Sequence, residues 1–242
     1  MKAYDSNKPL IHIHIPKTGG VSIKEIYKKW FNNGLLSHYY NERDGRMPQK
    51  HDLKALHTRN IDVCLYGHFN RKRNFGIEHY YPEVNQFITI LRDPFEKAVS
   101  SYLFLRKNSR NWKDQSRIPK VELHDFLLRK TDGAGMFNHF PRGVTLDNFK
   151  EVIETQFIEI GVLEHLDESM KRIASKLNYK YDPSSLQLLN ATKREQRIPY
   201  ELREEFIEKK PLDYAVYNYV LSKYTQQNYA LDSNSATLNR RQ

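Results

Sequence analysis

The sequence has 242 residues and a formal net charge of +10, with 39 lysines and arginines against 29 aspartates and glutamates. This length allows one α/β domain with a sizeable core, and the single cysteine, Cys64, excludes an internal disulfide framework and a multi-cysteine metal site. No apolar run is long enough to cross a membrane and no secretory signal begins the chain, so we expect a cytoplasmic protein. The charge favours an anionic partner, which could be a nucleic acid, a membrane surface or a nucleotide, although a merely solvated basic surface has the same composition.

The first predicted element is a strand over residues 10–15, a short apolar run that ends at a proline. It continues into a turn made of Lys17, Thr18, Gly19 and Gly20. Apolar residues then recur at helical spacing from Ile23, and we predict that Ser22 caps this helix. A strand, a glycine-containing loop and a helix N-terminus together predict an anion site, to which Lys17 adds a positive charge. The plainer alternative is an ordinary strand-to-helix turn with one exposed lysine.

Further strands and helices alternate along the chain. Strands are predicted at 61–66, 86–91 and 157–162, and helices at 94–103, 121–129, 146–154, 166–177, 199–209 and from 211 onward. Residues 32–50 are predicted to form an irregular loop. The pattern predicts the α/β class, with a mainly parallel sheet, helices on both faces and ligand sites at the strand C-termini. We assign residues 1–227 to a single domain and residues 228–242 to a disordered tail.

Three predicted strands end in polar side chains that would meet at one edge of a parallel sheet. Lys17 follows the first strand, His68 the second and Arg92 the third. Asp93 is suited to cap the helix that follows Arg92. Ser100 lies eight residues after Arg92, near the same ridge of that helix, so the pair predicts a second anion site.

Several segments resemble the sulfotransferases that use 3′-phosphoadenosine 5′-phosphosulfate (PAPS). The two strongest are PKTGGVS and LRDPFEKAVSSY, which are similar to the family's 5′-phosphosulfate loop and 3′-phosphate site. GHFN around His68 resembles the segment that carries the catalytic histidine in the branch of heparan-sulfate 2-O-sulfotransferases and bacterial carbohydrate sulfotransferases. Weaker likeness extends through IGVLEHLDES and LDYAVYNYV, so it covers most of the chain.

The resemblance implies a P-loop-like sulfotransferase fold and a role for each matching residue. Lys17 would stabilise charge on the leaving group, and His68 would take the proton from the acceptor hydroxyl. The donors to the 5′-phosphate would be Lys17, Thr18, Gly19, Gly20 and Ser22, and the 3′-phosphate would be held by Arg92 and Ser100. PAPS would be the co-substrate, 3′-phosphoadenosine 5′-phosphate (PAP) the product and a saccharide hydroxyl the acceptor, with no metal and no nucleic-acid partner.

Two residues depart from the family pattern. Val21 stands where relatives often have a hydroxyl residue, and Lys97 replaces the arginine common after R-D-P-x-x. Other residues have two readings. Arg92 could instead pair with Asp93 or Glu96. The basic residues Lys193, Arg194 and Arg197 would form either a lid over the 3′-phosphate or a solvated loop.

Two other functions compete with sulfuryl transfer. A P-loop kinase would need Mg²⁺ held by a loop hydroxyl and an acidic residue, and here Lys17 precedes the glycines instead of following them. A basic nucleic-acid-binding module would use the segment NRKRNF at residues 70–75 and neighbouring tyrosines. The sequence does not identify the acceptor or the oligomeric state.

Overall fold

The computed structural model describes residues 1–57, 61–128, 135–186 and 198–238. Its centre is a five-stranded sheet in the order β2-β3-β1-β4-β5, in which each neighbouring pair is parallel. The strands are β1 Leu10–Ile13, β2 Leu35–His38, β3 Cys64–Gly67, β4 Phe87–Leu91 and β5 Phe157–Val162. The predicted α/β class and parallel sheet are therefore confirmed.

The edge strand β2 corrects one sequence prediction, because it lies inside the stretch 32–50 that we predicted to be an irregular loop. It has four residues, and only His38 is buried. A strand this short, with three partly or fully exposed side chains, leaves no alternating apolar pattern to detect. Its pairing with β3 through Leu35 and Cys64 is what makes it a strand.

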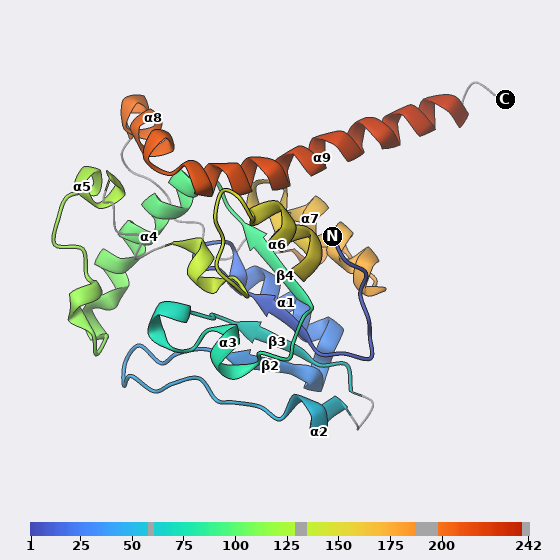
Figure 1. Ribbon diagram of the computed structural model, residues 1–242, viewed down its shortest axis with the longest axis horizontal. Coiled ribbons are helices and arrows are strands. Elements are labelled where there is room, and N and C mark those ends of the chain that lie inside the picture. The colour runs from blue at the N-terminus through green and yellow to red at the C-terminus, as the bar shows by residue number, and fades with distance from the viewer. Residues whose placement is uncertain (58–60, 129–134, 187–197, 239–242) are drawn as a thin grey trace.

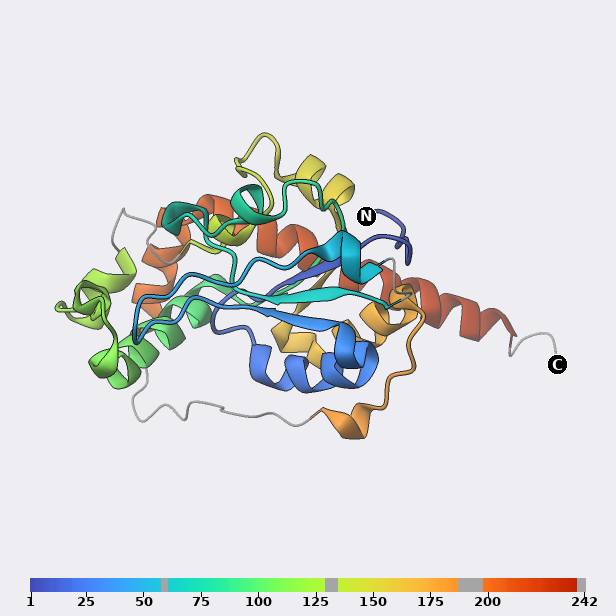
Figure 2. The ribbon, with the colours of Figure 1, turned by 90° about the horizontal axis from the view of Figure 1, so that it is seen from below.

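Helices cover both faces of the sheet, as predicted. They are α1 Gly20–Phe31, α2 Leu53–His57, α3 Ile77–Tyr80, α4 Pro94–Asn108, α5 Leu123–Leu128, α6 Phe149–Gln156, α7 Leu166–Leu177, α8 Tyr200–Lys209 and α9 Pro211–Leu238. Figures 1 and 2 show α1 and α7 on one face and α6 and α9 on the other. Within the described ranges, every helix is too short or too polar to span a lipid bilayer.

Side-chain alternation along β1 explains why both faces are covered. Leu10 packs into the core with α1 and α7, whereas Ile11 and Ile13 pack into the core with α6 and α9. All four residues of β1 are buried. Both faces of β1 are therefore covered by other elements. The C-terminal ends of β1, β3 and β4 lie side by side.

The last helix extends beyond the sheet. Figure 1 shows α9 continuing past the other elements, and its backbone is helical to Leu238, where the sequence favours a disordered tail. The assignment of residues 1–227 to one domain stays a prediction.

Candidate active site

The loop after β1 contains two residues in the left-handed backbone conformation, Lys17 with φ 72° and Gly19 with φ 80°. Glycine adopts this conformation freely, but for a lysine it costs about 1–2 kcal/mol. Thr18 is buried, and its hydroxyl donates a hydrogen bond to the carbonyl of Ile15 at 2.8 Å. The hydroxyl of Thr18 thus holds the loop against the end of β1.

Helix α1 begins at Gly20, with Gly19 as its N-cap residue. The first turn contains no acidic residue, and no side chain makes a capping hydrogen bond. Ser22 is therefore not the cap that the sequence predicted; it is a buried residue of the first turn. The glycine in left-handed conformation ends the loop and takes the cap position itself. A helix start without a capping side chain or a carboxylate favours the binding of an anion.

Gly20 is enclosed by two side chains from the sheet. A Cβ atom at Gly20 would lie 1.8 Å from Nε2 of His14, so no larger residue fits here. The hydroxyl of Tyr66, on β3, donates to the carbonyl of Gly20 at 2.7 Å. The contacts from His14 and Tyr66 therefore hold the start of α1 against the sheet.

The turn between β4 and α4 reaches the same loop. Nη1 of Arg92 donates to the carbonyl of Lys17 at 3.2 Å, and Nη2 lies 3.8 Å from the carboxylate of Glu96. The structure thus contains the ion pair that the sequence offered as an alternative, together with a direct link to the lysine loop. The two predicted anion sites adjoin.

Asp93 anchors this turn. One of its carboxylate oxygens accepts from the N–H of Glu96 at 3.0 Å, so Asp93 caps α4 as predicted. The other accepts from Arg203, on α8, at 2.6 Å. Its own N–H donates to Glu164 at 2.9 Å, and Glu164 also accepts from the hydroxyl of Tyr217 at 3.2 Å. Three elements distant in sequence therefore hold the residue next to Arg92.

The ammonium group of Lys17 lies against α4. Its Nζ is 4.3 Å from the centre of the Phe104 ring, a cation–π geometry. Burial and the nearby charge of Arg92 lower the pKa of Lys17. Ser100, one turn before Phe104 on α4, is 7% exposed. Lys17, Arg92 and α4 thus surround one positively charged region.

His68 follows β3, and its ring nitrogen Nδ1 is 2.6 Å from the carbonyl oxygen of His14. A carbonyl can only accept, so Nδ1 carries the proton and Nε2 has the free lone pair. Burial lowers the pKa of His68 to about 4, although the bond to His14 acts in the opposite direction. The rings of His14 and Tyr39 lie beside it, with centroids 4.4 and 4.9 Å away.

One further buried ring lies close to His68, and the charge of a buried lysine acts on that ring. The ring of His139 is centred 6.2 Å from that of His68, and its Nδ1 is buried without a hydrogen-bond partner. Lys97, on α4, is 6% exposed, and burial lowers its pKa to about 8 against the opposing charge of Asp213. The charge of Lys97 also acts to lower the pKa of His139.

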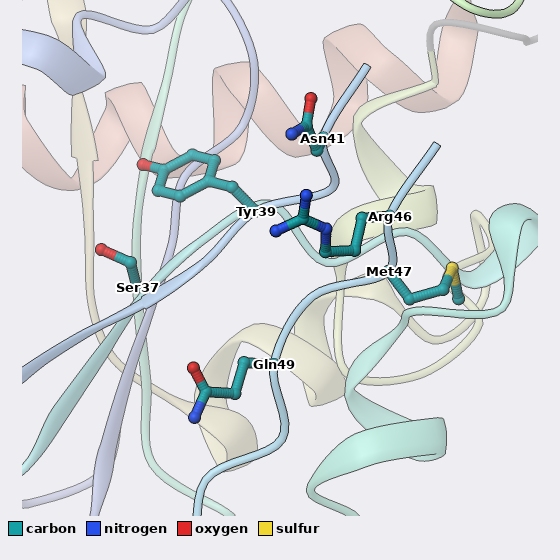
Figure 3. Close-up of a pocket in the computed structure, with 6 residues that line it drawn as sticks. All are labelled: Ser37, Tyr39, Asn41, Arg46, Met47 and Gln49. Carbon is teal, nitrogen blue, oxygen red and sulfur yellow. The ribbon is translucent and has the colours of Figure 1, made fainter. Parts of the chain in front are cut away.

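A pocket of about 420 Å³ lies beside the edge strand β2. It is lined by Ser37, Tyr39, Asn41, Arg46, Met47 and Gln49, which Figure 3 shows around a common space. The hydroxyl of Tyr39 lies 3.1 Å from Nδ1 of His14, so one wall of the pocket also borders the histidines. The lining residues carry amide, hydroxyl and guanidinium groups beside apolar surface such as the side chain of Met47.

The structure brings together the predicted residues Lys17, Gly19, Gly20 and Arg92 around the loop, with His68 at the neighbouring strand end. Ser100 is buried on α4, and its part in this site stays a prediction. The predicted lid residues Lys193, Arg194 and Arg197 lie outside the described residues. In the described part of the chain, no group of three or more histidine, cysteine, aspartate or glutamate side chains could hold a metal ion.

Sequence reasoning did not find Phe104, Tyr39 or His139 as site residues. Phe104 belongs to the apolar pattern of α4 only at its margin, and Tyr39 follows a strand that we did not predict. His139 stands in a stretch rich in glycine, asparagine and proline, which gives no periodic signal. Glu164 did carry a signal, because it follows a predicted strand, and the structure shows that it holds the turn at Arg92.

No protein-family model matches this sequence, and none of the curated proteins matches it. Solved structures do match. A mouse sulfotransferase, SULT7A1, crystallised in complex with PAP, aligns with a TM-score of 0.53 and 14% identity over 90% of each chain. A sulfotransferase from Alicyclobacillus acidocaldarius aligns with a TM-score of 0.49 and 13% identity, over 90% of this chain and 96% of that one. At this identity the likeness to SULT7A1 concerns the fold, and the chain therefore has the fold of a sulfotransferase.

Proposed function

We propose that this protein is a sulfotransferase that moves a sulfuryl group from PAPS to an acceptor hydroxyl. The observation that carries the proposal is the hydrogen bond from Arg92 to the carbonyl of Lys17. It brings two predicted anion-binding sites, each with a cationic side chain, next to each other at one edge of the sheet. A nucleotide with phosphates at both its 5′ and 3′ positions needs two such sites next to each other. His68 lies at the adjacent strand end, where it can meet an acceptor.

The donor would lie across the loop and α4. The N–H groups at the start of α1, with Lys17, would bind the 5′-phosphosulfate. Thr18 and Ser22 would contribute backbone N–H groups, since the hydroxyl of Thr18 is bound to Ile15. Arg92 and Ser100 would bind the 3′-phosphate. The absence of an acidic side chain in the first turn of α1 suits an anionic ligand.

The transfer step follows from these positions. The acceptor oxygen forms a bond to sulfur while the bond from sulfur to the bridging oxygen breaks, and the electron pair stays on the phosphate of PAP. The ammonium of Lys17 stabilises that developing charge. The hydroxyl proton moves to Nε2 of His68, which the bond from Nδ1 to His14 leaves unprotonated. Because the pKa of His68 is about 4, this base is ready at neutral pH.

The acceptor that we propose is a saccharide. The pocket beside β2 supports this choice, because its amide, hydroxyl and guanidinium groups can bind sugar hydroxyls and Tyr39 offers a ring for the apolar face of a sugar. The finer assignment to the branch of heparan-sulfate and bacterial carbohydrate sulfotransferases depends on the motifs PKTGGVS, LRDPFEKAVSSY and GHFN alone.

Calorimetry with PAP, 5′-AMP and ATP tests the donor assignment. We expect PAP to bind at least tenfold more tightly than 5′-AMP, which corresponds to about 1.4 kcal/mol. Arg92→Ala should remove this preference, because it removes the guanidinium for the 3′-phosphate. Lys54→Ala is the control, since Lys54 is an exposed lysine on α2. Equal binding of PAP and 5′-AMP by the wild type would reject the proposal.

Two assays on the same protein distinguish sulfuryl transfer from the two rival functions. A kinase would transfer phosphate from ATP and stop when a chelator removes Mg²⁺, whereas sulfuryl transfer should persist. A nucleic-acid-binding module would bind a polynucleotide in a salt-sensitive way and ignore PAP. In the structure, Arg71 and Arg73 of the basic segment form ion pairs with Glu78 and Glu42, which leaves fewer free cations for a polynucleotide.

A further inference from the structure

The side chain of His14 lies between the two parts of the candidate site. We call the loop at Lys17 with the start of α1 the donor side, and His68 with the pocket beside β2 the acceptor side. Toward the donor side, Nε2 of His14 lies against Gly20, where a Cβ atom would be only 1.8 Å from it. Toward the acceptor side, the centroid of the His14 ring is 4.4 Å from that of the His68 ring. His14 thus contacts both sides.

The hydroxyl of Tyr39 determines which nitrogen of His14 carries a proton. It lies 3.1 Å from Nδ1, and within the described residues it has no other hydrogen-bond partner. Burial raises the pKa of Tyr39, so the phenol keeps its proton and donates it to Nδ1 in a hydrogen bond. Burial also lowers the pKa of His14, so its ring is neutral and carries its single proton on Nε2.

The two neighbouring histidines therefore have opposite roles at Nε2. In His68, Nδ1 donates to the carbonyl of His14, which leaves a lone pair on Nε2. In His14, the hydroxyl of Tyr39 occupies the lone pair of Nδ1, which leaves an N–H on Nε2. The first ring can accept a proton, whereas the second can only donate a hydrogen bond.

The N–H of His14 is placed to meet an anionic ligand. It makes no hydrogen bond within the described part of the chain, and His14 is partly exposed. It adjoins Gly20, the first residue of α1, and the proposed function places the 5′-phosphosulfate at this helix start. Because the same ring contacts the proposed base, it lies toward the end of the phosphosulfate that the acceptor attacks, which is the sulfuryl group.

We propose that Nε2–H of His14 donates a hydrogen bond to an oxygen of the transferred sulfuryl group, and that Tyr39 is a positioning residue that fixes the tautomer of His14. This inference rests on the proposed function, because it assigns a contact to the same nucleotide donor. The hydrogen bond holds the sulfur in line between the leaving oxygen and the acceptor hydroxyl. His14 keeps its proton throughout the transfer.

Calorimetry with PAPS and with PAP, without an acceptor, tests this contact, because the two nucleotides differ only in the sulfuryl group. An asparagine amide can replace Nδ1 of a histidine but does not reach the position of Nε2. We therefore expect His14→Asn to lower the affinity for PAPS by about tenfold and to leave the affinity for PAP within about twofold of the wild type.

Two variants are compared with His14→Asn. The longer amide of His14→Gln reaches the position of Nε2, so this variant should bind PAPS about threefold more tightly than His14→Asn. His79→Asn is the control, since His79 is an exposed histidine on α3, and it should bind both nucleotides as the wild type does. Unchanged PAPS affinity in His14→Asn would overturn the inference. Equal losses for PAPS and PAP would also overturn it, because they would mean that the ring only packs against Gly20.

Tyr39→Phe tests the same contact with the ring of His14 retained, even if His14→Asn does not fold. Without the hydroxyl, the proton of His14 is shared between its two nitrogens, so the affinity for PAPS should fall by about threefold and that for PAP should not change. Equal PAPS binding by Tyr39→Phe and the wild type would remove the role of Tyr39.

Nitrogen-15 NMR of the histidine rings reads the two tautomers directly. The signals are assigned by their loss in His14→Gln and in His68→Gln. We expect the wild type to carry the proton of His14 on Nε2 and that of His68 on Nδ1. A proton on Nδ1 of His14 would overturn the inference.

The two proposals fail in different ways. Absence of PAP binding by the wild type counts against the proposed function, and the inference falls with it. PAP binding together with a PAPS affinity that does not depend on His14 leaves the donor site and the base in place, and removes only this contact.

Discussion

The donor side and the acceptor side of the candidate site are built differently. The donor side is tied to the sheet by buried hydrogen bonds, from Thr18 to Ile15, from Tyr66 to Gly20 and from Thr89 to Ile13. The acceptor side consists of irregular segments joined by half-exposed ion pairs and stacked rings, such as those around Glu42. The fixed side suits a constant nucleotide, and the side made of loops suits a ligand that differs from one enzyme to another.

The largest expected effect comes from the donor side. Lys17→Ala should lower the rate of sulfuryl transfer by about 10³-fold, because it removes the charge that stabilises the leaving phosphate. The rate is measured with labelled PAPS. Lys54→Ala, which changes an exposed lysine of α2, should transfer at the wild-type rate. Retained activity in Lys17→Ala would remove the central role of the loop.

The next effect concerns the boundary between the two sides. His68→Ala should lower turnover by about 10²-fold, at the low end for a general base, because a loose transition state requires little proton transfer early on. PAP affinity should stay within twofold of the wild type, since the role proposed for His68 concerns the acceptor. Full turnover in His68→Ala would disprove its assignment as the base.

A third effect measures how firmly the donor side is held. Asp93→Ala should lower the free energy of unfolding by about 1–2 kcal/mol, because it removes the cap of α4 and the bond from Arg203. Asp93→Asn should cost less, since an amide oxygen still caps the helix. Urea unfolding of both variants provides the comparison. Equal losses would show that the cap contributes little.

The smallest effect is a shift in pH dependence. The Phe104 ring stabilises the charged form of Lys17, so Phe104→Leu should lower the pKa of that lysine. Activity needs the ammonium form and is lost as pH rises through this pKa. The alkaline limb of the rate profile should therefore move to lower pH in Phe104→Leu and stay in place in Phe104→Tyr. Identical profiles in all three proteins would contradict the cation–π contact.

The sequence predicted the donor side better than the acceptor side for a physical reason. Lys17 and Arg92 follow buried strands whose apolar runs are continuous, so the sheet edge where they meet could be inferred. The cap at Asp93 was likewise local, and it is confirmed. The strand β2 was not predicted because three of its four side chains are partly or fully exposed, and the position of Tyr39, which follows it, was not predicted either.

Contacts between distant irregular segments leave no such trace. Glu42 is 31 residues from Arg73, and their pairing depends on how two loops fold over the sheet. The same holds for Glu164, which lies 71 residues from Asp93. Periodicity describes one element at a time, so it identified the ends of strands but not which loops would meet above them.

Helix α4 connects both sides of the site. Its first residues continue from Arg92, and near its other end Phe104 lies 6.1 Å from Trp112, the ring beneath Arg117. Fifteen residues of helix make a rigid rod of about 22 Å. Because the ring of Phe104 touches both Lys17 and Trp112, a change in the segment around Trp112 can reach the lysine of the proposed donor site through this one helix.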